Sequence, residues 1–238
     1  MNTRIGIIGA MDSEIEKLTK EEMTSEEVIQ KADFQFHKGK IGSTDVIIVR
    51  SGIGKVNAAI CAQIMIDCFD ITHLINTGIA GSLDNRINIG DIVLSTDAMH
   101  HDMDLSPLGF APGVIPRIGT AHSLSSFPAD PRLRELAAGV CRTALPGVGV
   151  HEGRIVSGDQ FISSADQKTR LVDTFQAICT EMEGAAIAHT AFVNHIPFLV
   201  VRAISDKADE EADVSFEAFE TQAAQNCARL VAGMVRSL

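Results

Sequence analysis

Acidic residues stand where several buried strands are expected to end. Each follows an apolar segment: Glu14 after residues 4–10, Glu181 and Glu183 after residues 177–180, and Asp206 after residues 197–204. In open α/β sheets, ligands bind just beyond the carboxyl ends of the strands, so we expect these carboxylates to share one site. Such a set indicates chemistry on protons and hydroxyl groups. Any one acid alone also fits a helix N-terminus, where Asp and Glu are favoured.

Two other groups of residues resemble functional motifs only in part. The segment Ser-Gly-Ile-Gly-Lys-Val at 51–56 shares Gly-Lys with a phosphate loop, but Val49 and Val56 stand where that loop needs Gly and Ser or Thr. No G-x-G-x-x-G motif follows the first apolar segment, which argues against a dinucleotide. The adjacent His100 and His101 would point to opposite faces of a strand. We therefore expect no cofactor and no metal ion.

Strand-like and helix-like segments alternate along the whole chain. The expected strands are 4–10, 34–37, 45–50, 74–78, 91–95, 177–180 and 197–204. The expected helices begin at a cap on Asp12 or Ser13, cover 55–69, 132–145 and 185–194, and end with one capped by Ser215. Strands apolar on both faces and separated by helices indicate a mostly parallel sheet covered on both sides. We expect one α/β domain over residues 1–238.

Residues 98–129 differ from the rest because they are rich in proline and glycine and show no sustained period. A long irregular loop inside a compact domain is usually functional, so we expect a lid or an interface arm here.

Composition excludes several classes of protein. The formal net charge of −11 argues against nucleic-acid binding, which needs an excess of Lys and Arg. No apolar stretch approaches the length of a membrane span. The five cysteines show no CxxC spacing and lie in apolar segments, as in a reduced cytosolic protein. We expect a cytoplasmic protein that acts on a small molecule.

Six short motifs in a fixed order resemble one known family. They are Gly-Ile-Ile-Gly-Ala-Met at 6–11 with Glu14, residues 51–56, Asn-Thr-Gly-Ile-Ala-Gly at 76–81, Val-Ser-Gly-Asp-Gln-Phe-Ile at 156–162, Glu-Met-Glu-Gly-Ala-Ala-Ile-Ala-His at 181–189, and Val-Val-Arg-Ala-Ile-Ser-Asp at 200–206. Through these motifs the chain resembles the nucleoside phosphorylase/nucleosidase superfamily and, within it, the 5′-methylthioadenosine/S-adenosylhomocysteine nucleosidases. The resemblance covers nearly the whole chain. It implies a central mixed, partly curled sheet flanked by helices, and a homodimer.

The implied reaction is hydrolysis of the N9–C1′ bond between adenine and a 5′-thio-substituted ribose. Carboxylates suit it because the ribose becomes cationic as the base leaves. By resemblance, Asp206 is the general acid that protonates adenine N7. Glu14, helped by Arg202, positions and deprotonates the attacking water. Glu183 binds the ribose hydroxyls, and Met182 packs on the sugar.

The resemblance also implies a set of binding residues. Phe161 matches the residue that stacks on adenine, the backbone of Ile162 would read the base edge, and Ser205 matches a neighbouring site residue. The other matches are apolar: Met11, Ile53 and Phe216 around the sugar, Leu105 and Phe110 in the 5′ pocket, and Leu108 and Pro116 from the partner subunit. Phe216 equally fits the core stripe of the last helix, Pro116 equally fits a turn, and His189 is expected to be structural.

Two positions depart from the family pattern. Ile79 replaces a serine that usually lies near the ribose and the attacking water, so a backbone amide or Arg202 would have to supply its hydrogen bond. Leu108 stands where an aromatic residue is common, which would reshape the 5′ pocket.

Three alternative functions stay open at this point. A purine nucleoside phosphorylase would need cationic groups for phosphate, but the first loop offers Asp12 and Glu14, and Asn76 and Ile79 occupy other positions expected to bind phosphate. A non-catalytic binding module is expected to lack one or more of the catalytic acids, whereas Glu14, Glu183 and Asp206 are all present. A hydrolase of futalosine-type nucleosides would use a similar site.

Overall fold

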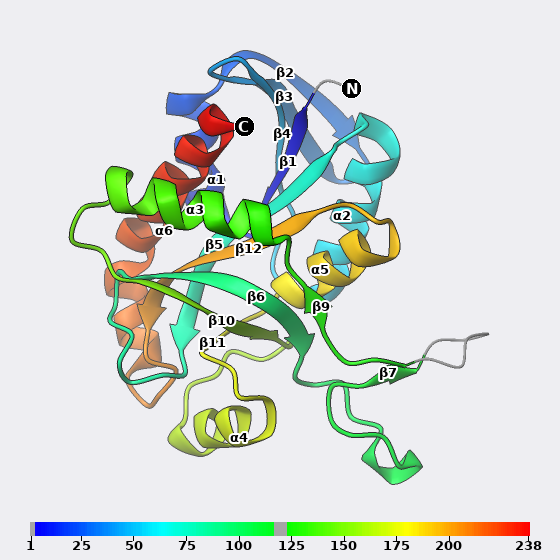
Figure 1. Cartoon of the computed structure of the whole chain (residues 1–238), viewed down its shortest axis with the longest axis vertical. Coiled ribbons are helices and arrows are strands. Elements are labelled where there is room, and N and C mark those ends of the chain that lie inside the picture. Colours follow the sequence, from blue (N-terminus) through cyan, green and yellow to red (C-terminus); the bar gives the residue numbers. More distant parts are fainter. Residues whose placement is uncertain (1–2, 117–122) are drawn as a thin grey trace.

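The apolar segments pair into one large mixed sheet (Figure 1). The computed structural model describes residues 3–116 and 123–238. Within these residues the sheet has ten strands: β1 (Arg4–Gly9), β2 (Thr24–Lys31), β3 (Phe34–Ile41), β4 (Thr44–Arg50), β5 (His73–Ser82), β6 (Ile92–His100), β9 (Phe127–Pro128), β10 (Val150–Ser157), β11 (Cys179–Glu181) and β12 (Phe198–Asp206). The expected fold class, a single α/β domain with a mixed, partly curled sheet, is confirmed.

The curl of the sheet comes from β11, which pairs with two strands. It runs parallel to β10 and antiparallel to β5. The order β11-β10-β6-β12-β5 therefore closes on itself, and β1, β4, β3 and β2 continue outward from β5 as an open sheet. Pairing is parallel from β12 through β5 and β1 to β4, and antiparallel where β12 meets β6. Among the described residues, five strand pairings in this sheet are parallel and five are antiparallel, so the mostly parallel sheet expected from periodicity is mixed instead.

Helices cover both sides of this sheet. They are α1 (Asp12–Lys17), α2 (Lys55–Phe69), α3 (Pro131–Ala144), α4 (Ala165–Phe175), α5 (Gly184–Val193) and α6 (Ala212–Ser237). The last helix, α6, packs on β12 and β5 and against α1 and α3, while α2 and α5 pack together on the other side (Figure 1). In the described part of the chain, no helix is long and apolar enough to cross a membrane.

The expected irregular segment 98–129 begins inside a strand, because β6 continues to His100. Beyond it the chain forms a 3₁₀ turn (Ser106–Leu108) and the short strand pair β7 (Ile115–Pro116) and β8 (Ser123–Leu124), and then joins the sheet as β9. The part around β7 extends away from the body of the molecule (Figure 1).

Several expected boundaries are corrected by the structure. Helix α1 begins after Met11 rather than at a cap on Asp12 or Ser13, because the Glu14 carboxylate accepts the backbone amides there. Helix α6 begins at Ala212, ahead of the expected cap at Ser215. Strand β3 runs through Gly39 to Ile41, so the turn to β4 is shorter than expected.

Candidate active site

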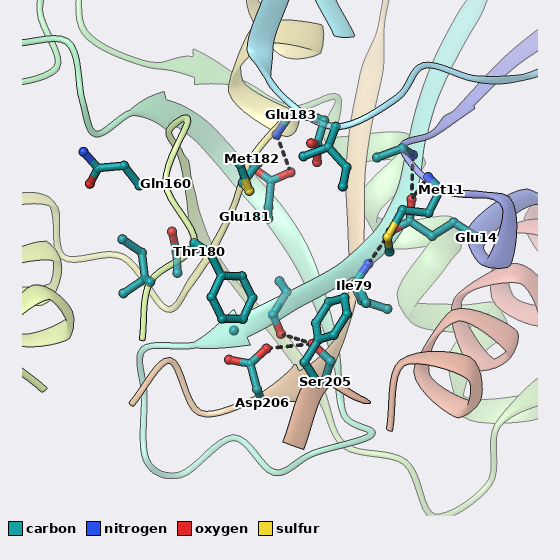
Figure 2. A pocket seen from close by; sticks show the side chains of 17 residues that line it. Met11, Glu14, Ile79, Gln160, Thr180, Glu181, Met182, Glu183, Ser205 and Asp206 are labelled. Carbon is teal, nitrogen blue, oxygen red and sulfur yellow. Dashed lines mark hydrogen bonds between the residues drawn. The ribbon is translucent and has the colours of Figure 1, made fainter. Parts of the chain in front are cut away.

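A pocket of about 620 Å³, counted with its opening to solvent, lies where β1, β5, β11 and β12 end. Its lining is mostly apolar, with carboxylates at several points (Figure 2). The lining residues are Ala10, Met11, Glu14, Ile53, Ile79, Ala80, Gly81, Gln160, Phe161, Ile162, Thr180, Glu181, Met182, Glu183, Ser205, Asp206 and Phe216. A concave, mainly apolar pocket with a few converging polar groups is the usual form of a small-molecule site.

Glu14 is buried at one side of the pocket and is held by three backbone amides. Its Oε2 accepts from Ala10 at 2.5 Å and Met11 at 3.1 Å, and its Oε1 accepts from Ile79 at 3.1 Å. Burial raises the pKa of Glu14, against the opposing effects of Arg202 and these amides. The carboxylate is thus fixed in place and more basic than usual. Ile79 contributes its amide here, and its side chain forms part of the apolar wall.

Glycine at position 78 allows Glu14 and Arg202 to approach each other. A Cβ at Gly78 would lie 2.6 Å from Glu14 Oε1 and 3.0 Å from Arg202 Nη1. Both contacts are closer than real Cβ atoms make without displacement. The backbone of β5 therefore has to lack a side chain at this point for the two charged groups to keep their places.

Arg202 lies behind the pocket wall and is bound by other residues. Its Nη2 donates to Glu181 and, at 2.5 Å, to Asn76 Oδ1. Burial alone would raise the pKa of Glu181, but Arg202, the Ser157 hydroxyl and the Gly184 amide together lower it. Glu181 and Arg202 thus form a buried ion pair.

Glu183 projects into the pocket two residues beyond Glu181 (Figure 2). Its Oε1 accepts from the Gly54 amide at 2.7 Å. Burial and the neighbouring charge of Glu181 raise the pKa of Glu183. A carboxylate in this position can accept hydrogen bonds from ligand hydroxyl groups.

Asp206 lies at the end of β12, across the pocket from Glu183 (Figure 2). Its Oδ1 accepts from the Ala208 amide and its Oδ2 from the Ser205 hydroxyl, both at 2.8 Å. Burial raises the pKa of Asp206 and outweighs these hydrogen bonds. A raised pKa favours the protonated form that a general acid needs.

Two phenylalanines lie at the pocket, Phe161 from the loop after β10 and Phe216 from helix α6. The rings of Phe161 and Phe216 meet edge to face with centroids 5.8 Å apart. Phe161 is 45% exposed, whereas Ile162 beside it is buried. Phe216 lines the pocket and also packs against the main core, so its position agrees with both interpretations of this residue. An exposed aromatic face at a pocket can stack on a planar ligand.

The structure brings together most of the predicted site residues, but not all of them. Leu105, Leu108, Phe110 and Pro116 lie in the segment after β6 and are absent from the pocket lining of this single chain. His189 also lies outside the lining, where its ring stacks on Phe127 at 4.5 Å.

All four acids line one pocket, as expected from their positions at strand ends, but they reach it from strands that run in different directions. Glu14 and Asp206 follow β1 and β12, which run parallel through β5. Glu181 and Glu183 follow β11, which runs antiparallel to β5, and they reach the pocket because β11 closes the curled part of the sheet. Sequence reasoning also missed the pairing of Glu181 with Arg202 and the lining residues Gln160 and Thr180. The Glu-Met-Glu spacing was the one available signal for Glu181.

The ionisable side chains that line the pocket are carboxyl groups. None of the described residues that line the pocket is Lys, Arg or His. The nearby Arg202 is already paired with Glu181. The pocket can therefore stabilise positive charge and move protons, but it offers no cation to bind an anionic ligand.

Comparison with known proteins agrees with this geometry. The family model described as the phosphorylase superfamily matches residues 4–236. A protein of Exiguobacterium called 5′-methylthioadenosine/S-adenosylhomocysteine nucleosidase is 39% identical over 99% of this chain and 98% of its own length. One of the same name from Staphylococcus aureus is 40% identical over 98% of this chain and 100% of its own.

Solved structures of similar proteins also include nucleosidases of this name. The nucleosidase of that name from Neisseria meningitidis, in complex with methylthio-immucillin-A, matches with a TM-score of 0.93 at 38% identity, over 99% of this chain and 100% of that one. A futalosine hydrolase mutant of Helicobacter pylori matches with a TM-score of 0.93 at 35% identity, over 99% and 100%. The chain belongs to the phosphorylase superfamily and, within it, to the 5′-methylthioadenosine/S-adenosylhomocysteine nucleosidases.

Proposed function

We propose that this protein hydrolyses the N-glycosidic bond of 5′-methylthioadenosine and S-adenosylhomocysteine, releasing adenine and the 5-thio-substituted ribose. The observation that carries the proposal is that Glu14, Glu183 and Asp206 line one pocket that has no Lys, Arg or His among its described lining residues. Relatives of about 40% identity along the whole chain carry the name of this activity.

Asp206 supplies the proton for the leaving base. Its protonated carboxyl donates to adenine N7, directly or through water, while the C1′–N9 bond breaks and its electron pair goes to adenine. Burial raises the pKa of Asp206, which favours the protonated form that this step needs. Phe161 stacks on the base, the Ile162 backbone reads its edge, and Ser205 holds the acid.

Glu14 supplies the nucleophile. It takes a proton from water as the water oxygen bonds to C1′, so one water is consumed and the proton later returns to Asp206 through solvent. Arg202 helps to hold this carboxylate in place. Glu183 accepts hydrogen bonds from the ribose hydroxyls, and Met11, Ile53, Met182 and Phe216 pack around the sugar. Negative charge close to the sugar stabilises its oxocarbenium character.

Phosphorolysis is disfavoured by the same charges. A phosphate beside C1′ would meet the Glu14 carboxylate and no free cation among the described lining residues. The test is to incubate the purified protein with 5′-methylthioadenosine, with and without phosphate, and to measure adenine. We expect equal rates, and adenine release that requires phosphate would overturn the proposal.

Hydrolysis of a futalosine-type nucleoside is the second candidate, because a futalosine hydrolase has a closely similar structure at 35% identity. The two substrate classes differ in the group at the 5′ position. Comparing kcat/KM for methylthioadenosine, S-adenosylhomocysteine and aminodeoxyfutalosine would show which one the protein prefers.

The proposal includes a homodimer in the cytoplasm. Val56 and Leu108 are 68% and 72% exposed, and Ile60 is exposed one turn after Val56 on α2. Covering these apolar residues with a second copy would bring Leu108 and Pro116 to the partner's pocket, where Leu105 and Phe110 complete the 5′ end. Light scattering should give twice the 25.5 kDa of one chain, and a monomer in solution would contradict the dimer. Cell fractionation tests the location.

A further inference from the structure

Lys55, Asp102 and Asp159 form a closed network beside the pocket. The Lys55 ammonium donates to Asp102 Oδ1. The Asp159 amide donates to Asp102 Oδ2 at 3.0 Å, and the Lys55 amide donates to Asp159 Oδ1 at 2.8 Å. Each member thus bonds to both others. None of the three lines the pocket.

The members of the network come from three different segments: Lys55 is the first residue of α2, and Asp102 and Asp159 lie in the loops after β6 and β10. Lys55 follows Gly54, whose amide donates to Glu183 at 2.7 Å, and Ile53 in the same loop lines the pocket. Asp159 stands two residues before Phe161. Asp102 is the second residue after β6, at the start of the segment with the proposed 5′-pocket residues. The three loops therefore serve the ribose, the base and the 5′ substituent.

The ion pair in this network is more shielded from solvent than an ordinary surface ion pair. The Lys55 and Asp102 side chains are each only 20% exposed. Burial would raise the pKa of Asp102, but Lys55 and the Asp159 amide lower it, so the carboxylate stays charged. Charge-assisted hydrogen bonds that are partly shielded from water are stronger and more directional than exposed pairs.

We propose that the Lys55–Asp102–Asp159 network positions the three substrate-binding loops as one unit. It rests on the nucleosidase function proposed above. Lys55 and Asp102 are positioning residues, because they act through Gly54 and Phe161 and do not line the pocket themselves. Loss of either charge lets the loops move independently, which weakens contacts to both the base and the sugar.

The test uses the whole protein and the variants Lys55→Met and Asp102→Ala. We expect each to raise KM for methylthioadenosine and the inhibition constant of free adenine by about tenfold or more, since small misplacements of positioning groups are costly. The value of kcat should fall much less. The double variant should be no worse than the single ones, because both remove the same interaction.

Asp97→Asn is the matched control. It weakens another partly buried ion pair, between Asp97 on β6 and Arg154, outside the pocket lining. We expect it to lower the melting temperature as the test variants do and to leave KM unchanged. Lys55→Arg, which keeps the charge, should restore most of the affinity for adenine.

The outcomes separate the two proposals. If Lys55→Met and Asp102→Ala keep the wild-type KM and adenine affinity, or if Asp97→Asn raises KM equally, the positioning role is wrong. If Asp102→Ala does not fold, Asp102→Asn keeps one acceptor and should show the same shift to a smaller extent. Wild-type protein that releases no adenine would instead contradict the nucleosidase function.

Discussion

The substitution Asp206→Asn separates proton donation from structure. Asp206 makes two hydrogen bonds within the protein, with the Ala208 amide and the Ser205 hydroxyl. An asparagine of nearly the same shape can still accept from Ala208 through its oxygen and donate to Ser205 through its nitrogen. The fold and the pocket should therefore persist, while the proposed proton donor to N7 is lost.

The expected loss is the contribution of one general acid. Such a group contributes about 10²–10⁴-fold, which is about 2.7–5.4 kcal/mol of transition-state stabilisation at 1.36 kcal/mol for each factor of ten. Chromatography of released adenine gives kcat, and equilibrium binding of methylthioadenosine to the variant gives affinity. We expect kcat to fall by this factor with affinity nearly unchanged.

The pH dependence and a control complete this prediction. Since the acid must be protonated and burial raises its pKa, wild-type kcat should fall as the pH rises through that raised pKa. Asp209→Asn, which removes a neighbouring charge outside the pocket lining, should change kcat little. Wild-type turnover in Asp206→Asn would refute the assignment of the general acid.

Three further changes test other parts of the site. Glu14→Gln should lower kcat by about 10²-fold or more while binding is retained; loss of ligand binding instead would remove its role as the water activator. Glu183→Gln should raise the melting temperature by about 2–4 °C for each kcal/mol gained. The Glu183 carboxyl is buried and has a raised pKa. Its contribution to folding stability is therefore present below the ordinary carboxyl pKa and is lost as the pH rises towards the raised pKa. An equal rise in the melting temperature of the variant at acidic pH would contradict this explanation. Arg202→Met should destabilise the fold by about 3–5 kcal/mol, because it leaves Glu181 charged and unpaired in the interior; denaturant unfolding measures this, and a loss below about 1 kcal/mol would show that the pair is not needed.

The elements that could be predicted from sequence are those with a strong local pattern. Helix α2 has the predicted bounds, and α3 and α5 differ by one residue at each end. Helix α3 has one apolar face, whereas α2 and α5 are apolar on most sides. Strand β2 was missed since its residues are nearly all exposed at the edge of the sheet. Strand β5 continues to Ser82, beyond the predicted end at residue 78, and Gly78 and Gly81 let charged side chains approach it there.

Some residues of the candidate site could likewise be predicted from the sequence, and others could not. Glu14, Glu183 and Asp206 were predicted because their types and positions after apolar segments are visible in the sequence. The Glu181–Arg202 pair was not, because it depends on β11 and β12 meeting around β5, a long-range contact with no local signal. Leu105, Leu108, Phe110 and Pro116 do not line the pocket of one chain, so their predicted roles depend on the proposed dimer.

The most direct test of the account is the identity of the sugar product when phosphate is abundant. Mass spectrometry of a reaction with methylthioadenosine in phosphate buffer distinguishes free 5-methylthioribose from its 1-phosphate. A pocket lined by carboxylates, with no cation among its described lining residues, predicts only the free sugar. Accumulation of the 1-phosphate would contradict the central claim.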